Sequence, residues 1–292
     1  MTYFRIDRPL TLYLFYLLLR RNRRRTKQQV PILMYHSIAS GRMQGGHPYF
    51  ETSTHPSVFS NHMKFLHDNG YSNLSLQDLI LHQSADKRLE RKSVVITFDD
   101  GFRDFLSEAF GVLDQYDYSA TVFLPTGFMQ KEGNMRLKSK EYLSWSEISK
   151  LSQNGIDFGS HSVNHLDLYA LRKSEIEFEI RESKEAIEKE IGTSIRSFSY
   201  PYAFPAQDMA FKKYLRDTLE KYGFNCCATT NIGTTSLTEK SFFLKRLPVN
   251  TFDDSKLLAA KLAGGYDWLY YLQYLFKLLK NRGTPLKESK TT

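Results

Sequence analysis

The feature that most constrains the fold is a regular alternation of two patterns between residues 30 and 250. Short apolar runs rich in β-branched residues, such as "SVVITFDD" and "SATVFLP", alternate with longer segments of helical periodicity, such as "SWSEISKLSQNG". This order predicts parallel strands covered by helices. Gly70, Gly155 and Gly192 stand where such helices would end. We therefore expect one α/β domain with its active site at the carboxyl ends of the strands.

The length and composition fit a single large domain with short extensions. The 292 residues are 41% hydrophobic and 25% charged, which is typical of a globular protein. The two cysteines, Cys226 and Cys227, are neighbours in the chain, and a bond between neighbours in an extended segment would be strained. We interpret them as small buried apolar side chains that say nothing about the redox compartment.

The net charge of +8 is concentrated at the two ends of the chain. Residues 1–27 carry a net +7 and residues 264–292 a net +3, which leaves −2 for the body between them. A slightly acidic body with basic ends is not typical of a nucleic-acid groove, so we expect no nucleic-acid partner. Within the body, the helix expected over 174–190 carries many charges, Glu179 among them, which we interpret as a solvated face without a catalytic role.

An apolar segment precedes the domain. Residues 9–19, "PLTLYLFYLLL", are apolar, and as a helix they would span roughly 16 Å, about half of the hydrocarbon core of a bilayer. The segment is thus too short to cross a membrane. The run "RRNRRR" that follows it favours retention on the cytoplasmic side, so export is disfavoured although it stays open.

The segment "DWLYYLQYLFKLLK" near the carboxyl end predicts an amphipathic basic helix. One side holds Trp268, Leu272, Leu275 and Leu279, and the opposite side holds Gln273, Lys277 and Lys280. Both end segments could pack on the domain and cover its apolar surface. Alternatively, they could lie in the plane of an anionic bilayer, which predicts peripheral attachment to the cytoplasmic face of a membrane. We expect an end segment over 1–29, a catalytic domain over 30–255, and a helix with a polar tail over 256–292.

Two adjacent carboxylates follow the apolar run "VVITF". Asp99 and Asp100 come at the end of this expected strand, where Gly101 permits a sharp bend. Like charges this close tolerate joint ionisation best when a cation lies nearby or when one carboxylate is engaged elsewhere. An Asp-Asp-Gly turn is also a common connection between a strand and a helix, so the pair alone leaves its role open.

A pair of histidines follows another short strand, "IDFGS". His161 and His165 are four residues apart, so a helical turn after the strand would place both imidazoles on one face, where they could share a metal. Such a pair is often accidental. Together with a strand-end aspartate, however, it forms a two-histidine, one-carboxylate set with open positions, which suits a catalytic divalent ion.

These residues resemble the polysaccharide deacetylases that share a NodB-homology domain, which form carbohydrate esterase family 4. "TFDDG", "SHSVNH" and "IRSFSYPYAFP" resemble the first three motifs of the family, and "VPILMYHSI" and "FLKRLPV" resemble its bordering strands. The similarity runs in order from about residue 30 to residue 252. The resemblance implies a distorted (β/α)7-type barrel with parallel strands and a divalent metal, commonly zinc and sometimes cobalt or nickel.

The resemblance also implies residue roles and a reaction. By position it assigns the metal ligands to Asp100, His161 and His165. It implies that Asp99 is the general base and that the backbone N–H of Tyr202 stabilises the tetrahedral oxyanion. Pro201 and Tyr202 could wall a sugar subsite, although a rigid turn explains "SYPYAFP" equally well. The implied reaction removes N-acetyl groups from N-acetylhexosamine residues of a polysaccharide or a lipid-linked glycan.

The sequence departs from the family pattern in the third motif. Many members have an arginine there that pairs with the base, whereas this chain has Ser199. Arg246 in "KRLPV" is our candidate for that pairing, and the alternative is an ordinary exposed arginine. Ala203 replaces a frequent glycine, so the backbone angles of that turn can differ from those of the family.

A further departure concerns the general acid, which is a late histidine in many members. No histidine follows His165 in this sequence. We expect either that Asp99 returns its proton or that His36 in "MYHSI" acts as the acid, and the alternative for His36 is a hydrogen-bonded supporting residue. Two other functions stay open: hydrolysis of another amide or a formamide on the same fold, and glycan binding without catalysis.

Overall fold

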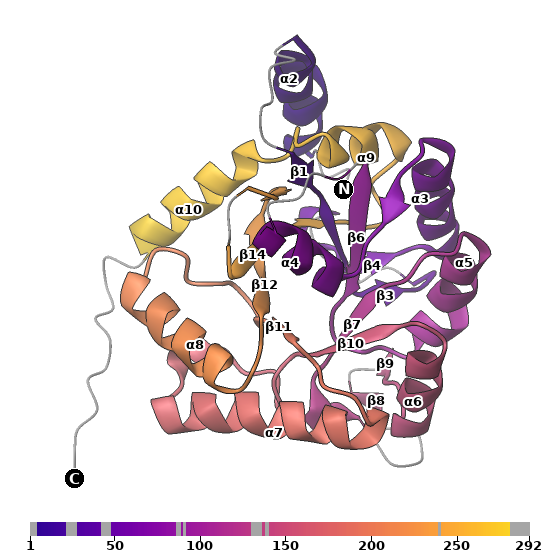
Figure 1. The fold of residues 1–292 in the computed structure, drawn as a ribbon. Coiled ribbons are helices and arrows are strands. Elements are labelled where there is room, and N and C mark those ends of the chain that lie inside the picture. The colour runs from indigo at the N-terminus through magenta and orange to yellow at the C-terminus, as the bar shows by residue number, and fades with distance from the viewer. Residues whose placement is uncertain are drawn as a thin grey trace.

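A closed ring of parallel strands forms the centre of the molecule, with helices around it (Figure 1). The computed structural model describes residues 5–21, 28–41, 48–85, 89, 92–129, 136–137, 140–238 and 241–280. In order around the ring, the strands are β2 (Ile32–Tyr35), β14 (Phe243–Pro248), β12 (Cys226–Ile232), β11 (Ser197–Ser199), β10 (Asp157–Ser160), β7 (Thr121–Leu124) and β6 (Ser93–Phe98). β6 pairs in turn with β2, which closes the ring, and all seven pairings are parallel. The predicted (β/α)7-type barrel is therefore confirmed.

Short strands and a set of helices complete the described fold. The short strands are β1 (Gln29–Val30), β3 (Ser37–Ile38), β4 (Ser53–Thr54), β5 (Ser72–Asn73), β8 (Arg136–Leu137), β9 (Lys140–Glu141) and β13 (Thr235–Ser236). The α-helices are α1 (Asp7–Leu10), α2 (Tyr16–Arg21), α3 (Pro56–Asp68), α4 (Leu76–Ala85), α5 (Phe110–Gln115), α6 (Trp145–Gln153), α7 (Lys173–Ile191), α8 (Met209–Lys221), α9 (Ser255–Leu262) and α10 (Trp268–Lys280). Shorter helical turns are η1 (Thr11–Phe15), η2 (Pro48–Phe50), η3 (Phe105–Ala109), η4 (Thr126–Phe128) and η5 (Leu168–Ala170).

Alternate side chains of the strands fill the barrel near the end where the strands begin. One buried apolar cluster contains Ile32, Val95, Phe123, Cys226 and Leu244 from the strands, together with Leu76 and Leu79 from α4. α4 therefore closes the barrel at the end where the strands begin, and it crosses the ring in Figure 1. Gly159 of β10 faces this interior. A Cβ atom there would lie 2.5 Å from the ring of Phe123, so only glycine leaves room for that ring.

Polar side chains occupy the next inward positions along two of these strands. Side chains of a strand alternate between its two faces, so Thr97 follows Val95 into the barrel and Arg246 follows Leu244. Arg246 is only 1% exposed, and its Nη1 donates to Thr97 Oγ1 at 3.3 Å. The next inward position on β6 is Asp99, at the strand end. The barrel thus carries a buried guanidinium directly below the predicted active site.

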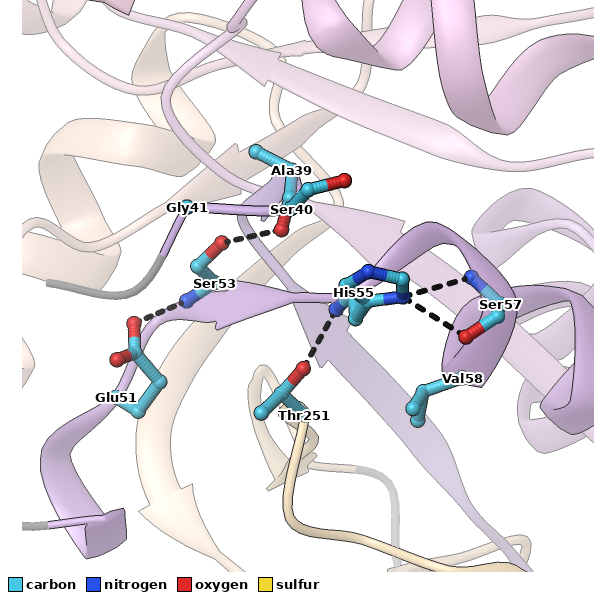
Figure 2. A pocket seen from close by; sticks show the side chains of 9 residues that line it. All are labelled: Ala39, Ser40, Gly41, Glu51, Ser53, His55, Ser57, Val58 and Thr251. Atoms are coloured by element: carbon cyan, nitrogen blue, oxygen red, sulfur yellow. Dashed lines mark hydrogen bonds between the residues drawn. The ribbon is translucent and has the colours of Figure 1, made fainter.

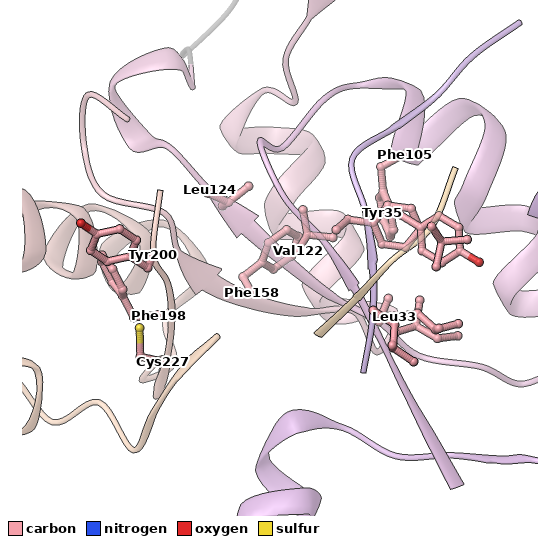
Figure 3. Packing of buried hydrophobic residues seen from close by; sticks show 14 of the residues in the cluster. Leu33, Tyr35, Phe105, Val122, Leu124, Phe158, Phe198, Tyr200 and Cys227 are labelled. Carbon is pink, nitrogen blue, oxygen red and sulfur yellow. The ribbon is translucent and has the colours of Figure 1, made fainter. Parts of the chain in front are cut away.

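A second, larger cluster packs the outside of the barrel against its helices (Figure 3). It includes Leu33, Tyr35, Val122 and Phe198 from the strands and Phe105 from η3. Gly192 ends α7 with a φ of 73°, and Gly70 and Gly155 follow α3 and α6 with φ of 69° and 82°. Their predicted role as helix stops is confirmed. Cys226 and Cys227 are buried and unbonded, as expected for small apolar side chains.

The amino-terminal segment packs against the last helices of the chain. Phe15 stacks on Trp268 with 4.8 Å between ring centroids, and Trp268 Nε1 donates to Thr11 Oγ1 at 3.1 Å. The amino-terminal segment therefore packs partly on the domain, which was one of the two alternatives for it. Leu14 and Leu18 of this segment stay exposed. Within the described residues, no helix combines the length and the apolar character that crossing a bilayer requires. Residues 22–25 of the basic run and the polar tail from 281 lie outside the described residues.

α10 does not pack on the domain through its apolar side alone. The amphipathic helix forms, but its polar side chains, Gln273 and Lys277, face the barrel and donate hydrogen bonds to it. Leu275 and Leu279 are 52% and 65% exposed. Both belong to the apolar side, which would be covered if the helix packed on the domain through that side. The later part of the helix thus turns its leucines outward, whereas Trp268 at its start packs on Phe15. The domain boundaries at residues 29/30 and 255/256 stay a prediction.

Candidate active site

Asp100, His161 and His165 meet at the carboxyl end of the barrel. Asp100 Oδ1 lies 3.6 Å from His161 Nε2 and 3.4 Å from His165 Nε2. One ligand atom from each residue lies within 4.8 Å of the other two. His161 is buried, whereas the side chains of Asp100 and His165 are 23% and 21% exposed. The cluster is therefore held from below and is open on one side.

The orientation of the two imidazoles favours metal binding. His161 Nδ1 lies 2.8 Å from the carbonyl oxygen of Ser199, which can only accept, so Nδ1 carries a proton and Nε2 is the ring nitrogen that faces Asp100. Burial, and then the electrostatic influence of His161, lowers the pKa of His165 to about 4. His165 is thus neutral at pH 7 and offers a lone pair. One carboxylate and two oriented imidazoles form a donor set that fits a divalent ion.

The local backbone brings the histidines together in an unexpected way. The helical turn suggested by their spacing does not form, and residues 161–167 are irregular. Ser162 and His165 instead adopt left-handed conformations, with φ of 66° and 51°, and Asp100 has a φ of 74°. Such angles are costly for residues other than glycine and persist only where the surroundings impose them. The cluster is therefore held by contacts outside its own segments.

Glu179 supplies one of these contacts, and the interpretation of its carboxylate as part of a solvated face was wrong. It is 2% exposed. Its Oε2 accepts from the N–H groups of Val163 and Asn164 at 2.8 Å each, and its Oε1 accepts from Asn164 Nδ2 at 2.6 Å. The sequence indicated that Glu179 is buried, because its helical spacing places it in the same stripe of α7 as the buried Ile176 and Ile180. Glu179 thus fixes the loop that carries His165.

Asp99 lies next to this cluster and is paired with Arg246. Arg246 Nη1 and Nη2 donate to Asp99 Oδ1 and Oδ2, both at 2.7 Å. Ser199 Oγ, at the position where the family often has arginine, lies 3.3 Å from Asp99 Oδ1 and 3.1 Å from Arg246 Nη2. The guanidinium reaches the aspartate from inside the barrel, and the alternative of an ordinary exposed arginine is excluded.

The pairing keeps Asp99 ionised. Burial alone would raise the pKa of this carboxyl, but Arg246 outweighs burial and holds the pKa well below its usual range. A carboxylate has about four lone-pair positions, and the contacts of Asp99 leave one of them for a further donor. Asp99 is therefore a buried, oriented anion that can still accept a proton.

Tyr202 lies beside the histidines on the loop after β11. Its ring is exposed and packs against His165, with 4.7 Å between the centroids. Tyr202 has a φ of 58°, so the left-handed residue of this turn is Tyr202 and not Ala203. Pro201 is buried, so Tyr202 is the one of these two that presents its side chain at the surface. Contact of either with a sugar stays a prediction.

His36 follows β2 and lies half-buried near the same site. An electrostatic influence of His36 contributes to lowering the pKa of both Asp99 and His165. The described contacts bring Asp100, His161, His165 and Tyr202 together and join the neighbouring Asp99 to Arg246. Their chemical roles stay predictions.

A separate concavity of about 230 Å³ lies beside β4 (Figure 2). None of the Asp100, His161 and His165 cluster lines it. Its histidine, His55, is engaged with the start of α3, because His55 Nδ1 lies 3.3 Å from the N–H and 2.8 Å from the Oγ of Ser57. The reactive groups of the molecule therefore gather at the barrel mouth and not in this concavity.

Comparison with known proteins points to one family. A family model described as "Polysaccharide deacetylase" matches residues 86–227. "Putative polysaccharide deacetylase YxkH" of Bacillus subtilis (strain 168) is 31% identical over 225 residues, which are 76% of this chain and 72% of that protein. The chain belongs to the polysaccharide deacetylase family. A second member of this family, the poly-beta-1,6-N-acetyl-D-glucosamine N-deacetylase of Staphylococcus epidermidis, is 26% identical over 215 residues, or 70% of each protein.

Solved structures of polysaccharide deacetylases share the barrel. A deacetylase of Streptococcus pyogenes in complex with acetate superposes with a TM-score of 0.69 at 24% identity, over 81% of this chain and 99% of that chain. The putative polysaccharide deacetylase BA0330 of Bacillus anthracis gives 0.65 at 25% identity, over 81% and 69%. The resemblance to the polysaccharide deacetylases is confirmed, and so is the fold expected from it.

Proposed function

We propose that this polysaccharide deacetylase is a metal-dependent N-deacetylase that acts on N-acetylhexosamine residues of a polysaccharide or a lipid-linked glycan. One observation carries the proposal: three oriented ligand side chains, Asp100, His161 and His165, lie directly beside a buried and ionised Asp99. The relatives named poly-beta-1,6-N-acetyl-D-glucosamine N-deacetylases support this substrate class. They do so by their names alone.

Asp100, His161 and His165 would hold the divalent ion. Zinc suits a mixed set of imidazole and carboxylate ligands with an open position, and cobalt or nickel can occupy the same ligands. When bound, such an ion supplies Lewis acidity, which polarises an acetamide carbonyl and makes water nucleophilic near neutral pH. Glu179 and the carbonyl of Ser199 keep the two histidines in place for it.

The residues around these ligands supply the proton transfers and the positioning. Asp99 takes a proton from the attacking water, and Arg246 holds both oxygens of Asp99 in place. The N–H of Tyr202 donates to the oxygen that becomes negative in the tetrahedral state. Protonated Asp99, next to a guanidinium, is a strong acid and returns its proton to the leaving amine, unless His36 does so. Normal activity and a normal pH profile of His36→Gln would remove His36 as the acid.

The proposal is tested by acetate release from N-acetylglucosamine oligomers and from a lipid-linked N-acetylated sugar. The full-length protein is stripped with a chelator and then reloaded with zinc, cobalt or nickel. We expect release only after reloading, and none from His165→Gln. His67→Gln serves as the matched control, because His67 is an exposed histidine of α3 away from the cluster.

Each other outcome has a distinct meaning. Release of formate from formylated substrates, without acetate release, would replace the proposal with the formamide alternative. Glycan binding without release of either acid would favour a non-catalytic member. Equal acetate release before and after chelation would overturn metal dependence.

We further propose that the protein lies peripherally on the cytoplasmic face of a membrane. The outward side of α10 exposes Leu275, Phe276 and Leu279, and η1 and α2 expose further apolar side chains. Six basic residues between positions 20 and 27 of the sequence would favour anionic lipid. A bilayer is a partner that would cover apolar side chains and attract basic residues at the same time.

Vesicle sedimentation of the full chain tests this attachment. We expect binding to vesicles that contain anionic phosphatidylglycerol, weaker binding at high salt, and loss of binding in Leu275→Gln/Leu279→Gln. Lys213→Gln, an exposed change on α8, serves as the control. Equal sedimentation of the double variant and the wild type would overturn attachment through α10. Protease digestion of the protein in intact spheroplasts would overturn the cytoplasmic location.

A further inference from the structure

One hydroxyl group bonds to both sides of the loop that presents Tyr202. Thr230 Oγ1 donates to the carbonyl oxygen of Tyr202 at 3.0 Å and accepts from the N–H of Phe204 at 3.1 Å. These two bonds span the turn that contains the left-handed Tyr202. A residue in such a conformation costs about 1 to 3 kcal/mol and needs surroundings that impose it. The position of Thr230 therefore sets the conformation of the Tyr202 peptide.

Thr230 itself lies in an irregular part of β12. The register between β12 and β14 shifts between Ala228 and Ile232, so the intervening backbone groups of β12 lose regular partners in the sheet. Buried backbone donors and acceptors need replacement partners. Thr229 Oγ1 and Arg246 Nε supply some of these partners, and α10 at the carboxyl end of the chain supplies others.

Gln273 of α10 bridges this irregular segment with both ends of its amide. Its Nε2 donates to the carbonyl oxygen of Thr230 at 2.8 Å, and its Oε1 accepts from the N–H of Ile232 at 3.1 Å. One turn later, Lys277 Nζ donates to the carbonyl oxygen of Phe204 at 2.5 Å and to Asn231 Oδ1 at 3.1 Å. α10 thus contacts the turn both through Thr230 and directly.

These contacts explain why α10 turns its polar side inward. An amphipathic helix that only covered apolar surface would bury Leu275 and Leu279 and leave Gln273 and Lys277 in solvent. At these four positions the helix does the opposite. The inward polar groups bond to backbone groups of β12 and to the carbonyl oxygen of Phe204 in the loop after Pro201, so this orientation supports that loop.

We propose that Gln273 is a positioning residue for deacetylation, which acts through Thr230 to hold the Tyr202 N–H beside the Asp100, His161 and His165 cluster. The inference rests on the proposed function, in which this N–H stabilises the oxyanion. The amide of Gln273 bonds to the backbone of Thr230 and Ile232 and to none of Asp100, His161 and His165. It lies outside residues 86–227, the part that the family model matches.

Steady-state kinetics on a soluble N-acetylglucosamine oligomer test the catalytic part. In zinc-loaded full-length Gln273→Met we expect kcat to fall about 10-fold to 100-fold, because the oxyanion donor is misplaced and not removed. KM and bound zinc stay within twofold of wild type. Gln273→Glu keeps only the acceptor for the N–H of Ile232, so its kcat should lie between those of wild type and Gln273→Met. The matched control is Tyr271→Phe at an exposed position of the same helix, which keeps wild-type kcat on this substrate. Wild-type kcat in Gln273→Met overturns the proposal.

A double-mutant cycle tests the route through Thr230. Thr230→Val removes the hydroxyl that spans the turn, so we expect Gln273→Met to add less than twofold to the loss already caused by Thr230→Val. If the two substitutions lower kcat independently, so that the loss in the double variant is the product of the two single losses, the route through Thr230 is overturned. A general loss of structure would instead lower bound zinc and the unfolding midpoint together with kcat, and that pattern would also overturn a positioning role.

Hydrogen exchange of the peptide over residues 200–206 separates this inference from the proposed function. In Gln273→Met we expect faster exchange there than in wild type, with unchanged exchange over β6 and β7. This readout needs no catalysis. If wild type releases no acetate with any metal, the proposed function fails and the catalytic part fails with it. If wild type is active and exchange over 200–206 does not change, only the positioning role is overturned.

Discussion

The tetrapeptide Thr-Phe-Asp-Asp occurs twice in this chain, at 97–100 and at 251–254, with different results. In both copies the first aspartate is buried and paired with buried cations. Asp99 is held by Arg246 at 2.7 Å, and Asp253 is held by Lys261 at 2.8 Å and by Arg5 at 3.3 Å. The first carboxylate is therefore satisfied in the same way at both places.

The second aspartates differ. Asp100 has a left-handed backbone and faces His161 and His165. Asp254 has an extended backbone, accepts from the N–H of Leu257 at 2.9 Å as the amino-terminal cap of α9, and pairs with Arg8 at 2.6 Å. Tandem carboxylates thus become a candidate metal site only where the fold brings other ligands to the second one. The following predictions test this contrast.

The largest effect is expected at the first copy. Asp99→Asn removes the proton acceptor, so acetate release should fall about 100-fold to 10,000-fold. Bound zinc should stay near the wild-type content, since Asp100 and both histidines remain. Steady-state kinetics and elemental analysis of the same sample measure both quantities. Activity within tenfold of wild type would contradict the role of Asp99 as base.

The equivalent change at the second copy should affect stability and not chemistry. Asp253→Asn leaves Lys261 and Arg5 without their buried anion, which should cost about 3 to 5 kcal/mol in the free energy of unfolding. Urea denaturation measures the loss. Below the unfolding transition, kcat should remain within twofold of wild type. A hundredfold loss of kcat in the folded variant would make the two copies functionally alike.

A smaller effect is expected from the capping aspartate. Asp254→Ala removes the acceptor for the N–H of Leu257 and should cost about 1 kcal/mol of stability. Asp254→Asn keeps a capping oxygen and loses only an exposed ion pair with Arg8, so its cost should stay within about 1 kcal/mol. Equal, large losses of bound zinc in these variants would contradict the assignment of the metal site to Asp100.

The smallest effect is a pH dependence of the same cap. Burial would raise the pKa of Asp254, but the hydrogen bonds from Arg8 and from the N–H of Leu257 outweigh burial and lower the pKa below its ordinary 3.8. The stabilisation is therefore complete above pH 4 and is lost as the pH falls through the lowered pKa. The stability difference between wild type and Asp254→Asn should be constant above about pH 4 and shrink as the pH falls below it. A constant difference would show that the carboxylate charge does not contribute.

The parallel strands with their covering helices and the two-histidine, one-carboxylate set could be predicted because their signals are local, whereas the barrel was implied by the family resemblance. Apolar runs that end in Asp100 and near His161 mark the carboxyl ends of parallel strands, and such ends meet at one mouth. Arg246 could be named as a candidate for pairing with Asp99 because the third motif lacks the family's arginine and Arg246 lies in "FLKRLPV", which resembles a bordering strand of the family. Its position inside the barrel follows only from strand alternation within a closed ring.

Other features depend on contacts that the local pattern does not contain. Glu179 was interpreted as a solvated charge, although its place among isoleucines on α7 already indicated burial. The two sides of α10 were identified correctly, but periodicity does not say which side faces the domain. That choice depends on an irregular segment of β12 some 40 residues earlier, whose backbone groups bond to Gln273.

Bound metal, measured by elemental analysis after zinc loading and dialysis, tests the Asp100, His161 and His165 site most directly. We predict one zinc ion per wild-type chain and none in His161→Gln/His165→Gln. The control His55→Asn/His67→Gln, which changes two histidines outside the cluster, should keep one ion. A wild-type chain that retains no zinc, cobalt or nickel, or a His161→Gln/His165→Gln chain that retains as much as wild type, would contradict the metal centre.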